Sequence, residues 1–261
     1  MKEVAEFHEF TWDLIRALPK AYYHHSKGDK VKVFCKPGLS ELYYFADEVE
    51  EVDRFDAYND SLSYNKEAPK YALSEWTPPP LKDKFGKFIK FNKPTVVIQN
   101  KYSLEWLQGT FNYFPTEVLG EIFAYLKENY DIIYIRPKGD DKRYYKDENE
   151  IQEFNDYEYI AENHPYVYTI NKFMELYPQY SFNVMQLMLQ ATADKHITVS
   201  GGNACLSAYF GGDVIIYDSP EGKGAGRRVW DSGSWLSKLN NANIIGMNNY
   251  QDIINKIKEI W

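Results

Sequence analysis

Residues 94–261 alternate between short apolar runs and segments with apolar residues at helical spacing. The apolar runs predict buried strands at 94–100, 131–135, 167–170, 196–199 and 213–217. The periodic segments predict helices at 117–129, 182–193, 203–210 and 250–261. Continuously apolar strands that take turns with helices indicate a parallel sheet covered on both faces. We therefore expect an α/β fold with a Rossmann-like C-terminal lobe.

The first ninety residues carry a weaker pattern. A helix is predicted over 10–18 with Pro19 as its stop, a strand over 30–34, a short helix over 40–46, and turns through the acidic stretch 47–60. Three consecutive prolines, 78–80, cannot continue a helix or a central strand, so they indicate a linker. We expect a small N-terminal lobe, 1–90, and a Rossmann-like lobe, 91–261, with 140–163 as a polar surface excursion.

Composition limits the class of protein. A hydrophobic fraction of 44% allows a packed core, and a formal charge of −8 argues against a general nucleic-acid binder. Cys35 and Cys205 lack metal spacing, which indicates free thiols in a reducing compartment. The acidic N-terminus lacks the apolar length of a signal peptide, and no run of about 18 apolar residues exists to span a membrane. A cytoplasmic location is expected.

Tyrosine is unusually frequent, with 23 Tyr and 6 Trp in 261 residues. Such rings can line sites for carbohydrates or bases, because the flat face stacks while the polar tip forms hydrogen bonds. The alternative is a coding bias toward Tyr, Asn, Lys and Ile, and composition alone leaves both open.

Polar residues follow the predicted strands at their carboxyl ends, where open α/β sheets bind ligands. This rule selects Asn100, Lys101, Arg136, Lys138, Ser200 to Ala204 and Asp218 to Glu221 as candidates.

The loop Ser200-Gly201-Gly202-Asn203 is the strongest of these candidates. Its glycines let the backbone turn sharply, and the free N–H groups of the following helix can point at an anion. It matches neither a P-loop nor a dinucleotide fingerprint. The alternative is a strand-to-helix turn without a ligand.

The glycine-rich segment 222–228 ends in Arg227 and Arg228, which can bind diphosphate oxygens in a bidentate manner. A solvated basic loop is the alternative. Asp218 and Glu221 precede this segment and could accept hydrogen bonds from ribose or sugar hydroxyls, or could be ordinary surface acids.

Acidic residues also gather near the first predicted helix, where Glu9 and Asp13 could serve as a general base. Acids at a helix start are also explained by the helix macrodipole. No Asp-x-Asp follows a predicted strand and no histidine has a ligand-spaced companion, so neither a metal nor another cofactor is implied.

The run from 182 to 217, with ADKHITVSGGNACLSAYFGGDVIIY, resembles the donor half of GT-B glycosyltransferases such as heptosyltransferases and related fucosyltransferases. PTVVIQNKYSLEW is similar to the strand that opens that half, and HEFTWDLIRALPKAYYHH to an N-terminal pattern of bacterial and viral sugar transferases. The resemblance implies two Rossmann-like lobes facing a cleft, with a small N-terminal lobe. It also implies metal-independent transfer of a sugar from a nucleotide-sugar donor to a glycan acceptor.

In that scheme Ser200 to Asn203, with Arg136 or the pair Arg227 and Arg228, would hold the diphosphate. Asp218 or Glu221 would contact sugar or ribose, and Glu9, or less favourably Asp13, would deprotonate the acceptor. Two alternatives stay open: an epimerase or hydrolase of nucleotide sugars with the same pocket, and a non-catalytic nucleotide- or carbohydrate-binding module. Oligomeric state is not predicted.

Overall fold

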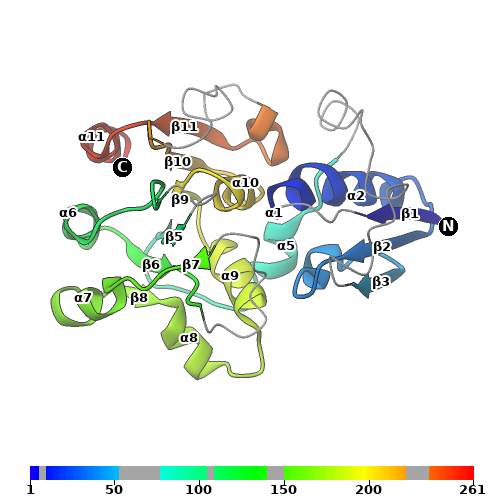
Figure 1. Cartoon of the computed structure of the whole chain (residues 1–261), viewed down its shortest axis with the longest axis horizontal. Coiled ribbons are helices and arrows are strands. Elements are labelled where there is room, and N and C mark those ends of the chain that lie inside the picture. Colours follow the sequence, from blue (N-terminus) through cyan, green and yellow to red (C-terminus); the bar gives the residue numbers. More distant parts are fainter. Residues whose placement is uncertain (6–9, 53–76, 105–108, 140–149, 222–234) are drawn as a thin grey trace.

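The computed structural model describes residues 1–5, 10–52, 77–104, 109–139, 150–221 and 235–261. Two parallel sheets organise these residues, a three-stranded sheet near the N-terminus and a six-stranded sheet in the rest of the chain (Figure 1). We call residues 1–52 the N-terminal part and residues 94–261 the C-terminal part. Glu9, Arg227 and Arg228 lie outside the described residues, as does the whole segment 222–228.

The six-stranded sheet has the order β8-β6-β4-β9-β10-β11, and all its neighbours are parallel. Numbered along the chain, that order is 3-2-1-4-5-6, the doubly wound arrangement of dinucleotide-binding folds. The expected α/β class with a Rossmann-like C-terminal part is confirmed. The strands are β4 (Thr95–Gln99), β6 (Asp131–Ile135), β8 (Tyr168–Thr169), β9 (Lys195–Val199), β10 (Asp213–Tyr217) and β11 (Asn243–Met247).

Both faces of this sheet are buried, as the continuous apolar strands predict. In β10, Val214 and Ile216 belong to one apolar cluster, while Ile215 and Tyr217 belong to another on the opposite face. The covering helices are α6 (Thr116–Leu126), α7 (Asp156–Asn163), α8 (Ile170–Leu176), α9 (Phe182–Gln190), α10 (Gly202–Ala208) and α11 (Tyr250–Ile260), with a 3-10 turn at Trp235–Leu239. The sequence analysis did not predict β11, because only its second residue is buried and no apolar run marks it.

The N-terminal part contains β1 (Lys2–Ala5), β2 (Val31–Cys35) and β3 (Glu48–Glu51), which pair in parallel in the order β1-β2-β3. β2 alternates as predicted, with its odd-numbered residues buried. β3 is a correction, because turns were expected there. Its four residues are all exposed, so no apolar period marks it, and pairing with β2 alone makes it a strand.

The first helix is also longer than predicted. A short α1 (Phe10–Trp12) passes into a π-helical turn, Asp13–Ala17, and then into α2 (Leu18–Ser26), so Pro19 does not end the helix. A proline inside an α-helix loses one hydrogen bond and clashes with the carbonyl four residues earlier. The wider π-helical turn just before Pro19 relieves that conflict. Farther along, the expected helix at 40–46 is a single 3-10 turn, Ser40–Tyr43.

The predicted linker carries one helical turn, α5 (Leu81–Phe85), directly after the three prolines. Leu81 and Phe85 are buried, and α5 packs against α9. The surface excursion expected at 140–163 is wrong in its second half: β7 (Glu150–Ile151) pairs antiparallel with β5 (Ser103–Leu104), and 156–163 form α7, in which Asp156, Tyr157 and Ile160 are buried.

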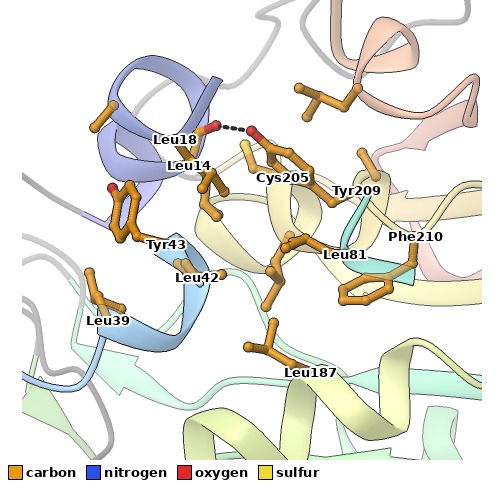
Figure 2. Close-up of a cluster of buried hydrophobic side chains, with 14 of the residues drawn as sticks. Leu14, Leu18, Leu39, Leu42, Tyr43, Leu81, Leu187, Cys205, Tyr209 and Phe210 are labelled. Atoms are coloured by element: carbon orange, nitrogen blue, oxygen red, sulfur yellow. Dashed lines mark hydrogen bonds between the residues drawn. The ribbon is translucent and has the colours of Figure 1, made fainter. Parts of the chain in front are cut away.

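One apolar cluster joins the N-terminal part to the C-terminal part. In Figure 2, Leu14 and Leu18 from the first helix lie against Cys205 of α10 and Tyr209 just after it, with Leu81 below them. The Tyr209 hydroxyl donates a hydrogen bond to the Leu14 carbonyl. The division into lobes at residue 90 stays a prediction, and the described contacts across it are those of a continuous core.

Both cysteines, Cys35 and Cys205, are buried and free, as expected. Among the described residues, no helix is long and apolar enough to cross a membrane.

Replacing Leu14 with alanine should lower the free energy of unfolding by about 2–5 kcal/mol, because a buried leucine is lost from the shared cluster. Unfolding should remain one transition, since both parts depend on that cluster. Urea denaturation followed by fluorescence and by circular dichroism measures both quantities. Leu176→Ala, at a 71% exposed leucine, is the matched control and should change little. Two separate transitions in Leu14→Ala would contradict a shared core.

His196 on β9 should make the protein less stable in mild acid. Complete burial, and then the charge of Lys82, lower the pKa of His196 to about 3 from its usual 6.5. Below pH 6.5, His196 therefore binds a proton in the unfolded chain but stays neutral in the folded chain. The free energy of unfolding consequently falls as the pH falls toward 3. Between pH 7.5 and 5 this group should contribute about 2 kcal/mol of that loss. In urea titrations over this pH range, the free energy of unfolding of His196→Leu should fall by about 2 kcal/mol less than that of the wild type. Equal losses in the two proteins would refute the assignment.

Candidate functional site

The order of the six-stranded sheet reverses between β4 and β9. From β4 the chain proceeds outward through β6 and β8, and then returns to β9 on the other side of β4. The connections after β4 and β9 consequently leave toward opposite faces of the sheet, and doubly wound sheets bind their ligands in a crevice between such connections, at the carboxyl ends. Asn100 and Lys101 follow β4 there, and Ser200 to Gly202 follow β9.

Lys101 and Gly201 meet at this crevice. Gly201 has φ of +112°, a conformation that L side chains rarely adopt, and a Cβ built on it would lie 3.6 Å from the Lys101 Nζ. The lysine ammonium thus stands beside backbone that only glycine readily forms. Two candidates predicted from the sequence, about 100 positions apart, thus lie side by side.

The next glycine meets the N-terminal part instead. A Cβ on Gly202 would lie 2.7 Å from Cδ1 of Phe10, so the side chain at 202 must be a hydrogen atom for α1 to pack this closely. Ser200 is 6% exposed, and its N–H continues the sheet by donating to the Tyr217 carbonyl at 2.8 Å. Asn203, in the first turn of α10, is half-buried.

The side chain of Asn100 forms its hydrogen bonds within the protein. It is fully buried, its Nδ2 donates to the Phe114 carbonyl, and its Oδ1 accepts from the N–H groups of Phe114 and Lys101, all near 3.0 Å. These bonds fix the turn that presents Lys101. Gln99, the residue before, accepts a hydrogen bond from Ser207 of α10 at 3.0 Å, which ties the end of β4 to that helix.

Arg136 is likewise held inside the protein. It is 2% exposed, and its guanidinium pairs with Asp156 through Nε and Nη2 and also reaches the carbonyls of Pro137 and Phe154. Burial opposes the charge, but the hydrogen bonds and charge of Asp156 outweigh it and raise the pKa of Arg136. This buried pair anchors α7 to the end of β6. Lys138, two residues on, lies with Nζ 4.7 Å from the ring centre of Tyr157.

Asp218 and Glu221 lie beyond β10, the neighbour of β9. The Asp218 N–H donates to Met247, which continues the pairing with β11, and its side chain is half-buried. Ser219 is held by Asn112, whose Oδ1 accepts the Ser219 N–H at 2.9 Å. Glu221 is exposed. Lys101, Gly201 and Asp218 thus occupy the ends of three adjacent strands.

Asp13 belongs to the N-terminal part, in the π-helical turn that packs against α10. It is fully buried, and the Tyr43 hydroxyl donates a hydrogen bond to its Oδ1 at 3.2 Å. Burial, and then the negative charge of Asp13, raise the pKa of Tyr43, which therefore stays a proton donor in this bond. Asp13 and Phe10 belong to one continuous helix. The candidate base is therefore connected through α1 to the loop at 200–203.

Lys36 is a candidate that the sequence analysis missed. It directly follows β2 and is only 2% exposed, although burying an ammonium group is costly unless other groups compensate its charge. The strand-end rule, applied to the predicted strand at 30–34 as it was to the later strands, would have selected this region.

A depression of about 450 Å³ opens at the other end of the sheet, beside the first residues of β4 and β9. Ile89, Phe91, Lys93 and Lys195 are among its lining residues. We assign the candidate site to the carboxyl ends in spite of this hollow, because the strand-order reversal creates the ligand crevice of a doubly wound sheet there.

Comparisons with known proteins show the fold. No family model and no curated protein sequence matches the chain. Among solved structures, E. coli ADP-heptose LPS heptosyltransferase II is similar with a TM-score of 0.60 and 10% identity, covering 99% of this chain and 98% of that one. A glycosyl transferase family 9 structure from Veillonella parvula has a TM-score of 0.53 and 10% identity, covering 99% and 89%.

Proposed function

We propose that this chain is a glycosyltransferase that moves a sugar from a nucleotide-sugar donor to a carbohydrate acceptor without a metal ion. Two glycosyltransferase structures share its fold over nearly its whole length, and that likeness supports the class of enzyme. Because a fold does not determine a reaction, the proposal depends on the crevice between β4 and β9.

The main argument for the donor site is that the Lys101 ammonium group lies beside the Gly201 backbone. A diphosphate placed at this crevice would find an ammonium group on one side and glycine backbone that permits close approach on the other. In the proposal Lys101, Ser200 to Asn203 and Lys138 bind the donor phosphates, together with Arg227 and Arg228. Asn100 and Arg136 support this edge through their internal bonds, and Asp218 or Glu221 contacts ribose or sugar.

The reaction needs a base and a stabilised leaving group. The base removes the proton of an acceptor hydroxyl, the oxygen bonds to the anomeric carbon, and the diphosphate leaves with the electron pair of the broken C–O bond. Cationic side chains and backbone N–H groups stabilise the departing charge. Asp13 is the base we favour among the described residues, because its helix contacts the loop at 200–203 through Phe10; since its carboxylate is fully buried, the proposal requires this turn to open for the acceptor hydroxyl to reach it. Glu9 is the alternative.

Lys101→Ala should weaken binding of ADP and UDP at least tenfold, the expected loss of one charge-assisted hydrogen bond. Isothermal titration calorimetry with and without EDTA measures it, and EDTA should change nothing. Lys90→Ala, at an exposed lysine by the amino ends of the strands, is the control. If the wild type binds no nucleoside diphosphate, the donor proposal is wrong. Conversion of a donor sugar without any acceptor would instead favour an epimerase or hydrolase.

Asp13→Asn should lower kcat by a hundredfold or more while leaving the donor Kd nearly unchanged, because it removes the base and keeps the shape. Tyr43→Phe removes only the hydroxyl that orients the carboxylate, so kcat should fall roughly three- to tenfold. Steady-state kinetics with a donor and acceptor pair, together with calorimetry, separates the two effects. Full turnover in Asp13→Asn would assign the base to another residue, Glu9 first.

A further inference from the structure

Three half-buried aromatic rings gather beside the crevice, and the donor site described above does not use them. Tyr102 follows Lys101 after β4, Tyr113 lies just before α6, and Phe154 lies just before α7. Phe154 belongs to the segment 140–163 that follows β6 and reaches this place from there. There β7 pairs with β5, and the Gln152 N–H donates to the Tyr102 carbonyl at 2.8 Å.

The rings of Tyr102 and Phe154 form a stacked pair, with centroids 4.7 Å apart and planes inclined by only 18°. Tyr113 stands nearly perpendicular to both, 4.9 Å from Tyr102 and 5.8 Å from Phe154. Three nearly equal distances place Tyr113 beside the pair and not at its end. Tyr113 therefore supports the edges of the two rings, and Phe154 covers one face of Tyr102.

The second face of Tyr102 has no ring against it among the described residues. The Phe154 end of the pair is anchored, because the Arg136 guanidinium carbon lies 5.8 Å over that ring and is itself fixed by Asp156. The Tyr102 end is next in sequence to Lys101, whose ammonium group lies beside Gly201. A rigid ring is thus held at the ligand edge, one residue from the proposed phosphate contact.

We propose that the second face of Tyr102 stacks against the base of the nucleoside diphosphate donor. The inference rests on the proposed function and adds a base subsite to it. A held tyrosine ring loses little conformational entropy on binding, and stacking on it tolerates any base, because purines and pyrimidines all present a π-face. Phosphates beside Lys101 and Gly201 and a base on Tyr102 would place the two ends of the nucleotide on consecutive residues of one strand end.

The test compares ligands with and without a base. Tyr102→Leu should weaken binding of both ADP and UDP roughly tenfold, while binding of inorganic pyrophosphate changes less than twofold. Tyr102→Phe, which keeps the ring, should bind all three ligands within twofold of the wild type. Tyr125→Leu, at a 38% exposed tyrosine on α6, is the matched control and should bind them like the wild type. Calorimetry gives the affinities, and circular dichroism verifies that each variant folds.

A second measurement needs no variant. Transferred nuclear Overhauser effects in the wild type with ADP should connect the adenine protons to tyrosine ring protons.

Each contrary outcome has a distinct meaning. If the wild type binds ADP and UDP, and Tyr102→Leu binds them equally well, the stacking proposal is overturned while the donor proposal stands. If Tyr102→Leu weakens pyrophosphate as much as ADP, the side chain acts on the phosphate site, and base stacking is again overturned. If the wild type binds neither nucleoside diphosphate, the donor proposal fails and the base subsite fails with it.

Discussion

β4 pairs with β6 on one side and with β9 on the other, and the place of the candidate donor site follows from that position. A buried parallel strand cannot leave its N–H and C=O groups unpaired, so β4 must have a neighbour on each side. The neighbours come from different halves of the C-terminal part, which makes the connections diverge above β4 and β9. Lys101 and Gly201 meet only because these two strand ends are adjacent.

A second constraint is the apolar cluster between the first helix and α10. Leu14, Leu18 and Tyr209 bury this contact, and Gly202 lets Phe10 approach the start of α10. The same contact sets the place of Asp13, which lies on the helix turn between Phe10 and Leu14. Packing between the two parts therefore positions a candidate base in one and a candidate phosphate loop in the other.

The polar residues at the strand ends divide by their partners. Asn100 and Arg136 form hydrogen bonds within the protein, to backbone groups, the Tyr134 hydroxyl and Asp156, and both are almost fully buried. Lys101 and Asp218 are half-buried at the same edge. The first group makes the edge rigid, and the second can meet a ligand. Arg136 also lies over Phe154, so the ion pair and the stacked rings share one support.

The amino-acid sequence by itself determined the elements whose periodicity is local. The strands β4, β6, β8, β9 and β10, the helices α6, α9, α10 and α11, and the turn at Ser200 all follow from spacing that a short window contains. β1, β3 and β11 carry no such period, because they are short or mostly exposed, and only pairing with a neighbouring strand defines them.

Tertiary structure decided which strand ends meet and which charges are buried. Arg136 and Asp218 look alike in sequence as polar residues after apolar runs, but Arg136 is buried against a carboxylate 20 positions away, whereas Asp218 is half-buried. Likewise, no local pattern places Phe154 on Tyr102, since the two rings are about fifty positions apart in the sequence and α6 and β6 lie between them. Spacing along the chain predicts burial, whereas the partner of a buried charge or ring depends on contacts between distant segments.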